Sequence, residues 1–266
     1  MNACVVLMYH MVDSPQSNRE ATLCCSPTNF AAQMEYLHRH DYAVIRLAQL
    51  VRSLRDGGDL PNRSVVITFD DGSSCTYEKA MPILRKFDFP ATVFVISGLV
   101  GGSNEWLQRV GFPERRMLSV EEVRRLDAAG LDVGSHTVSH PWLGRIPLDQ
   151  ARAEVRDSKT QLEDFLGRQV MHFAYPYGDY TAAVRDLVVE AGYMAACSTR
   201  WGKNHAKNEL FAVRRVEIKG QDSLLQFALK LRVGTHNMPP LPEARNLVRR
   251  GLEAMGYPRR QYPKDS

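Results

Sequence analysis

Two adjacent aspartates, Asp70 and Asp71, follow directly after the apolar run SVVITF and stand before Gly72. Two carboxylates held this close together repel each other, which raises the pKa of one of them. A divalent cation bound by one of the carboxylates would remove that repulsion. Successive residues of a strand point to opposite faces, but a chain that turns at Gly72 can present both acids on one rim. The motif therefore predicts a metal site and two different roles for the two acids.

Two histidines four residues apart, His136 and His140, lie in the segment GSHTVSHP after another apolar run. Pro141 disfavours helical backbone at His140, so the pair is expected on a loop that leaves a strand through Gly134. Two imidazoles and one carboxylate form a three-ligand site with an open position for water, as in catalytic zinc sites. The alternative is that HxxxH is a surface coincidence and DDG a simple turn.

Two further apolar runs end in polar or aromatic residues. Tyr9 and His10 end the first run, and Tyr175, Pro176 and Tyr177 end a later one. Taken singly, His10 is typical of a hydrogen-bonded buried histidine and YPYG of a loop without chemistry. In a parallel barrel, however, the C-terminal ends of the strands converge on one rim. The position of all these groups at predicted strand ends favours an active site on that rim.

The elements that would hold these residues alternate between two patterns. Apolar, β-branched runs typical of buried parallel strands start at residues 5, 43, 64, 91, 132, 172, 194 and 212. Amphipathic segments typical of helices lie between them, at 29–38, 77–87, 120–129, 148–166 and 182–191. We predict a single α/β domain, a distorted (β/α) barrel of about seven parallel strands over 1–234. A short C-terminal helix and tail over 235–266 would pack on the barrel or extend from it.

The composition is that of an ordinary globular protein, with 44% hydrophobic and 24% charged residues. A net charge of +4 over 266 residues does not predict a nucleic-acid partner. The apolar start is too short for a signal sequence or a membrane span, and the five cysteines form no CxxC motif. We therefore expect reduced cysteines and a cytoplasmic protein. The basic tail is expected to pack on the barrel, with contact to a membrane surface or a protein as the alternative.

TFDDG at 68–72 and SHTVSH at 135–140 resemble the first two motifs of the polysaccharide deacetylases, carbohydrate esterase family 4. The resemblance covers most of the chain and implies a distorted (β/α) barrel. It implies that Asp70 is the catalytic base and Asp71 a metal ligand, and that His136 and His140 are the other two ligands. The implied cofactor is a divalent ion. Zn²⁺ suits this ligand set, and Co²⁺, Ni²⁺ or Fe²⁺ would fit similar geometry.

FAYPYG at 173–178 resembles the family's third motif, R-x-P-Y, whose tyrosine walls the groove and supplies a backbone N–H to the oxyanion. Tyr177 matches that tyrosine, whereas Ala174 stands where the arginine that orients the base is expected. We expect Arg215 on the last predicted strand to replace it, with Arg214 as second candidate. If Arg215 only orients the base, its replacement by alanine should lower turnover with little effect on folding.

MYHMV at 8–12 resembles the subgroup that deacetylates exopolysaccharides such as poly-N-acetylglucosamine, in which an N-terminal Tyr-His supplies the general acid. His10 would then be the acid, and the family's usual late Leu-x-His motif is not found. FAYPYGDY and ACSTRWG resemble the same subgroup. Five residues are expected to contact substrate, with core packing as the alternative for the tryptophans: Tyr9, Tyr175, Pro176, Trp106 and Trp142.

The resemblance implies a metal-dependent hydrolase that removes N-acetyl groups from an N-acetylated oligosaccharide, polysaccharide or sugar precursor and releases acetate. Two alternatives remain open. One is a catalytically inactive barrel that binds a sugar or a protein partner. The other is a metal hydrolase of a non-sugar amide, since the same ligands and water would serve it. A cytoplasmic location would favour a nucleotide sugar, a lipid-linked sugar or a short oligosaccharide over assembled wall polymer.

Overall fold

The computed structural model describes residues 2–205 and 209–236 of the chain. The predicted tail helix and its basic residues lie outside the described residues, so their contact with a membrane surface or a protein stays a prediction. None of the described helices has both the length and the apolar character needed to cross a membrane.

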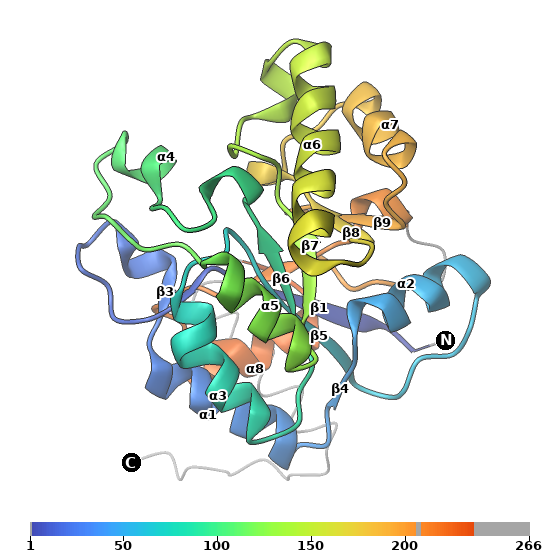
Figure 1. The fold of residues 1–266 in the computed structure, drawn as a ribbon. Helices are drawn as coiled ribbons and strands as arrows, with labels where there is room; N and C mark the ends of the chain where they lie inside the picture. Colours follow the sequence, from blue (N-terminus) through green and yellow to red (C-terminus); the bar gives the residue numbers. More distant parts are fainter. Residues whose placement is uncertain (1, 206–208, 237–266) are drawn as a thin grey trace, which may run out of the picture.

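A curled parallel β-sheet forms the centre of the described structure (Figure 1). Its strands pair in the order β10-β1-β5-β6-β7-β8-β9, and the short strand β4 pairs with β5 off this path. Every pairing in this sheet is parallel, which confirms the predicted α/β barrel fold. The strands of this sheet are β1 (Cys4–Tyr9), β4 (Ala43–Val44), β5 (Ser64–Phe69), β6 (Thr92–Val95), β7 (Asp132–Ser135), β8 (His172–Ala174), β9 (Ala195–Cys197) and β10 (Val216–Glu217). A separate parallel pair joins β2 (Met11–Val12) to β3 (Cys24–Cys25).

The two edges of the main sheet approach each other beyond β9. Val213, which precedes β10, forms a parallel bridge with Cys197. The Val213 N–H donates to the carbonyl of Ala196 at 2.9 Å, and its carbonyl accepts from the N–H of Ser198 at 2.9 Å. The segment that leads into β10 thus runs beside β9, which places Arg215 within reach of the other strands.

Helices connect the strands, and most of them cover the outer face of the curled sheet, whereas α2 packs against its inward-facing residues (Figure 1). Ser119 and Ser223 each begin a helix with a reciprocal capping box, which satisfies N–H groups that the helix itself leaves unpaired. The helices are α1 (Pro27–Arg39), α2 (Leu47–Asp56), α3 (Met81–Arg85), α4 (Glu105–Gln108), α5 (Val120–Ala128), α6 (Leu148–Leu166), α7 (Ala182–Glu190) and α8 (Leu224–Val233). The five predicted helical segments are all helical, although the one at 77–87 is divided into a π-helical turn (η2, Thr76–Ala80) and α3.

Two predicted strands are much shorter than their apolar runs. The run at 43 gives only Ala43–Val44, because Arg46 already caps the start of α2. The run at 212 gives only Val216–Glu217, because a 3-10 turn (η6, Leu210–Ala212) occupies its start. The sequence patterns also did not predict α2 and α8 as helices.

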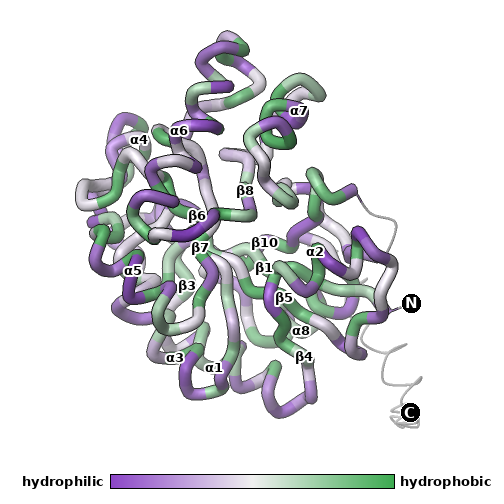
Figure 2. The backbone as a smooth tube through the Cα atoms, turned by 45° about the vertical axis from the view of Figure 1, so that its right-hand side comes forward, coloured by the Kyte–Doolittle hydropathy of each residue, from purple (hydrophilic) through white to green (hydrophobic). Residues whose placement is uncertain are grey.

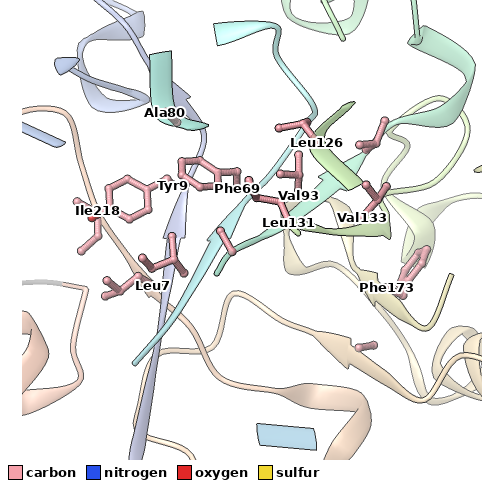
Figure 3. Close-up of a cluster of buried hydrophobic side chains, with 14 of the residues drawn as sticks. Leu7, Tyr9, Phe69, Ala80, Val93, Leu126, Leu131, Val133, Phe173 and Ile218 are labelled. Carbon is pink, nitrogen blue, oxygen red and sulfur yellow. The ribbon is translucent and has the colours of Figure 1, made fainter. Parts of the chain in front are cut away.

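The sheet separates two apolar layers. Alternate residues of each strand face outward and pack under the helices, as Leu7, Tyr9 and Phe69 do in Figure 3. The residues between them, such as Val66 and Phe94, face inward and form a second cluster with the apolar face of α2. This alternation follows from the two-residue period of a strand. Figure 2 shows the resulting apolar centre and the more hydrophilic outer helices.

Candidate active site

The three predicted metal ligands lie together at the C-terminal ends of β5 and β7. Asp71 follows β5, and His136 and His140 follow β7. Asp71 Oδ1 lies 3.5 Å from His136 Nε2 and 3.4 Å from His140 Nε2, and the two Nε2 atoms are 3.2 Å apart. A tetrahedral ion with bonds of about 2.0–2.1 Å holds its ligands about 3.3 Å apart. The spacing of these three atoms therefore fits one ion of the size of Zn²⁺.

The protonation of the two imidazoles also fits metal binding. His136 Nδ1 lies 2.8 Å from the carbonyl oxygen of Ala174, to which it donates, so His136 Nε2 keeps its lone pair toward Asp71. Burial lowers the pKa of His140 to about 3, although Asp71 acts in the opposite direction. His140 is therefore neutral near pH 7 and offers a lone pair. Burial raises the pKa of Asp71, but the neighbouring side chains of His136, His140 and His10 bring it below its ordinary value, so Asp71 is an ionised carboxylate.

Left-handed backbone brings these ligands to the rim. Asp71 has φ 72° and is followed by Gly72 at φ 80°, so the chain turns sharply at the end of β5. Thr137 and His140 have φ 68° and 63°, a conformation that costs free energy in residues other than glycine. The Thr137 hydroxyl oxygen accepts a hydrogen bond from the His140 N–H at 3.0 Å, which supports this tight loop.

Asp70 forms a buried two-bond ion pair with Arg215. Arg215 Nη1 and Nη2 donate to Asp70 Oδ1 and Oδ2 at 2.6 and 2.8 Å, and both side chains are buried. Burial raises the pKa of Asp70, but the Arg215 charge and its hydrogen bonds, with His136, bring the pKa below its ordinary value. Asp70 is thus an ionised carboxylate beside the metal-ligand trio, as a general base requires.

Arg215 reaches Asp70 through the interior of the barrel. Its Nε donates to the carbonyl of Ser198 at 3.0 Å, and its guanidinium carbon lies 5.6 Å from the centroid of the Phe94 ring. Phe94 and Ala174 belong to the same inward-facing cluster, so the small Ala174 side chain leaves space inside the sheet. Arg214, the second candidate, is exposed, because neighbouring residues of an extended segment point to opposite sides.

A comparison of the sequence with protein families decides the affiliation. Residues 57–196, more than half of the chain, match the polysaccharide deacetylase family, and the matched segment contains Asp70, Asp71, His136 and His140. The chain belongs to the polysaccharide deacetylase family. This confirms the resemblance that the two short motifs indicated.

Relatives and solved structures of this family agree with the fold. The structure of IcaB from Ammonifex degensii matches with a TM-score of 0.76 and 28% identity, covering 88% of this chain and 98% of that one. The Streptococcus pyogenes deacetylase PplD, solved in complex with acetate, matches with a TM-score of 0.75 and 27% identity over 86% and 98%. A Staphylococcus aureus (strain MRSA252) poly-β-1,6-N-acetyl-D-glucosamine N-deacetylase is 35% identical over 162 residues, 58% of this chain and 53% of that one. The chain spans about half the length of this staphylococcal relative.

In this member of the polysaccharide deacetylase family, His10 directly follows β1 and is half-buried. The Asp70 N–H donates to the carbonyl of Tyr9 at 2.9 Å, which aligns the ends of β1 and β5. His10 is near enough to both aspartates that its charge lowers the pKa of each. His10 and Arg215 thus lie near the base from two different strands.

Tyr177 lies over the ligand trio on a short turn (η5, Pro176–Gly178). Its ring contacts the His140 ring edge-on, with 4.5 Å between centroids, and its φ is 58°. Its N–H donates no hydrogen bond to any described residue. The turn thus holds a backbone donor near the metal ligands, as the predicted oxyanion role requires.

The two predicted tryptophans occupy different places around this turn. The ring centroid of Trp106 in α4 lies 5.1 Å from that of His140, and Trp106 is half-buried. Trp106 therefore forms part of the wall of the site. Trp142 stacks on Tyr177 at 3.9 Å with an interplanar angle of 6°. The Arg145 guanidinium carbon lies 4.1 Å from the Trp142 ring centroid. Because Tyr177 covers one face of the indole, Arg145 lies against the other face. Tyr177 and Arg145 thus lie against Trp142, which is still 40% exposed, and its contact with a sugar ring stays a prediction.

Three other predicted substrate contacts lie in the core. Tyr9 is fully buried and donates from its hydroxyl to Gln33 of α1 at 2.7 Å. Tyr175 is also fully buried, and its hydroxyl donates to the carbonyl of Phe211 at 3.2 Å. Pro176 is buried as well. These predictions are wrong because the side chains of Tyr9 and Tyr175 point to the outer face of the sheet, away from the inward-facing Asp70.

Glu154 of α6 is a residue of the site that the sequence analysis missed. Its Oε2 accepts hydrogen bonds from the N–H groups of Val138 and Ser139 at 2.8 and 2.9 Å. These bonds hold the strained loop between the two histidine ligands. Only the packing of α6 against this loop identifies Glu154, since a glutamate on a polar helix face carries no sequence signal.

We expect Glu154→Ala to weaken metal binding about 10- to 100-fold, because the loop would lose the anchor that aligns His136 and His140. A titration with a competing chelator measures the affinity. Asp164→Ala removes an exposed acid from the same helix and serves as the control. Equal metal affinity in the two variants would contradict a positioning role for Glu154.

Proposed function

We propose that the protein is a metal-dependent deacetylase that removes N-acetyl groups from an N-acetylated polysaccharide or oligosaccharide and releases acetate. The observation that carries this proposal is the ionised Asp70, paired with Arg215, next to three ligand atoms spaced for one ion. The family affiliation supports the substrate class. The similarity to the staphylococcal poly-β-1,6-N-acetyl-D-glucosamine N-deacetylase favours a polymer of β-1,6-linked N-acetylglucosamine as substrate. The cytoplasmic location remains a prediction from the sequence.

The ligand set of Asp71, His136 and His140 would hold the metal, with Zn²⁺ as the proposed ion. A divalent ion supplies Lewis acidity toward an amide carbonyl and a water molecule. Asp70 would accept a proton from the attacking water, and Arg215 keeps this carboxylate ionised and oriented. The Tyr177 N–H would donate to the oxyanion that develops at the amide carbon. His10 would give a proton to the departing amine, which leaves poorly unless protonated.

The test begins with the metal content of the purified protein, measured by elemental mass spectrometry beside Asp71→Ala and His136→Ala. We expect about one divalent ion per chain, lost in both variants. Acetate release is then measured from β-1,6-linked N-acetylglucosamine oligomers and from small N-acetyl amides. Release from the small amides alone would favour the non-sugar hydrolase. A metal-loaded protein that binds the oligomers without releasing acetate would be the inactive binding barrel.

We predict that Trp142→Ala lowers kcat up to about 100-fold, because Tyr177 loses the stack that holds its N–H toward the oxyanion. KM and metal content should change little if Trp142 acts by supporting Tyr177, because Tyr177 and Arg145 both lie against its ring. Steady-state kinetics separate the two parameters, and Trp142→Phe should restore most of kcat by restoring an aromatic stack. A raised KM with unchanged kcat would instead make Trp142 a sugar contact.

A further inference from the structure

A second concave site lies at the end of the barrel opposite the metal-ligand trio. Its cavity has a volume of about 750 Å³ and is lined by Val5 and Ser64 at the starts of β1 and β5. Asp70 and His10 follow the other ends of these same strands. The strand residues between the two sites span about 15–20 Å, so the cavity is separate from the catalytic rim. Its volume is that of a small-molecule binding site.

Positive charge gathers in this cavity without an acid to balance it. Arg63, Lys203 and Arg232 line it, and no acidic residue of the described chain does. None of the three forms an ion pair with a described residue. Burial and the nearby Arg232 charge lower the pKa of Lys203, which shows that these two cations lie close enough to repel each other. An anion placed between them would relieve that repulsion.

Aromatic side chains line the cavity beside these cations. Tyr36 and His40 are stacked with 4.0 Å between ring centroids, and both line the cavity together with Tyr42. The Arg63 guanidinium lies 5.9 Å from the Tyr42 ring centroid, and its Nη1 donates to the His40 carbonyl at 2.7 Å. Burial raises the pKa of Tyr42, while Arg63 and Arg232 act to lower it, so both arginines lie near its phenol. Aromatic surface and cationic groups thus meet in one cavity.

We propose that this cavity binds a phosphate-bearing small molecule, with the phosphate between Lys203, Arg232 and Arg63 and an attached ring against Tyr42. Guanidinium and ammonium groups are the side chains that bind phosphate most strongly, through charge-assisted hydrogen bonds. The rings supply contact area for the remainder of the ligand. The site does not depend on the proposed deacetylase activity, because it shares no residue with the catalytic rim.

Isothermal titration calorimetry at constant ionic strength tests the proposal on the full chain with three probes: inorganic phosphate, glucose 6-phosphate and adenosine monophosphate. We expect saturable binding that is at least 10-fold tighter for a ring-bearing probe than for inorganic phosphate. Lys203→Met should weaken it at least 10-fold, because the ammonium is lost. The methionine keeps an unbranched stem, which is needed because the Lys203 stem packs against Gly234.

Lys86→Met is the matched control, since it removes one exposed positive charge at the end of α3. Thermal unfolding checks that both variants fold. Binding unchanged in Lys86→Met and weakened in Lys203→Met and Arg232→Met would support the site. No saturable heat with any probe, or equal weakening in all three variants, would overturn it. Affinities equal for all three probes would overturn the contact of a ring with Tyr42.

Discussion

Asp70→Asn is expected to lower the rate of acetate release about 100- to 10,000-fold while the metal content stays unchanged. Asparagine keeps the size of the side chain but cannot take a proton from water. In the wild type, Arg215 and His136 hold the pKa of Asp70 below its ordinary value, so the carboxylate is ionised and ready to act as the base. Single-turnover acetate release from an N-acetylglucosamine oligomer, measured beside elemental mass spectrometry, gives both quantities.

Asp71→Asn is the matched control for this prediction, because it makes the same chemical change one residue further along. The carboxylate of Asp71 lies within 3.5 Å of both histidine Nε2 atoms, so this variant should lose metal and activity together. The pair of variants separates base from ligand. Near-normal turnover in Asp70→Asn, or metal loss in that variant alone, would show that the two roles are assigned to the wrong aspartates.

Arg215→Ala should lower the free energy of unfolding by about 3–5 kcal/mol and also abolish most of the activity. The sequence alone predicted little effect on folding, whereas the burial of Arg215 leads us to expect a large one. Arg215 is fully buried and forms both hydrogen bonds to the Asp70 carboxylate, so its removal leaves a buried negative charge without a partner. Urea denaturation followed by circular dichroism measures the loss.

Arg214→Ala provides the control, because Arg214 is the exposed neighbour on the same segment, and its unfolding free energy should change little. The double variant Asp70→Asn with Arg215→Met removes both charges at once. It should be more stable than the sum of the two single effects predicts, because no unpaired charge remains. Additive losses would mean that the two side chains do not stabilise each other.

The sequence by itself determined the fold class and the candidates for the metal ligands. Continuous apolar, β-branched runs that alternate with helical patterns predict a parallel sheet covered by helices, and parallel strands bring their C-terminal ends to one rim. Acids and histidines directly after such runs must therefore meet. Strand ends are local features of the sequence, so His136, His140 and the two aspartates could be identified as candidates. The choice of Asp71 rather than Asp70 as the ligand came from the resemblance to the family motif.

Only the tertiary structure decided how the other side chains are used. Tyr9 and Tyr175 stand at strand ends as Asp70 does, yet they point to the opposite face and join the core under the helices. Which face a residue takes depends on the register and curl of the sheet, which no local pattern reports. Arg215, for which the sequence also offered Arg214, reaches the site from 145 residues beyond Asp70, and Glu154 reaches it from the helix after the histidine loop. Such contacts arise from packing between distant segments, so the physical roles of these residues exist only in the folded chain.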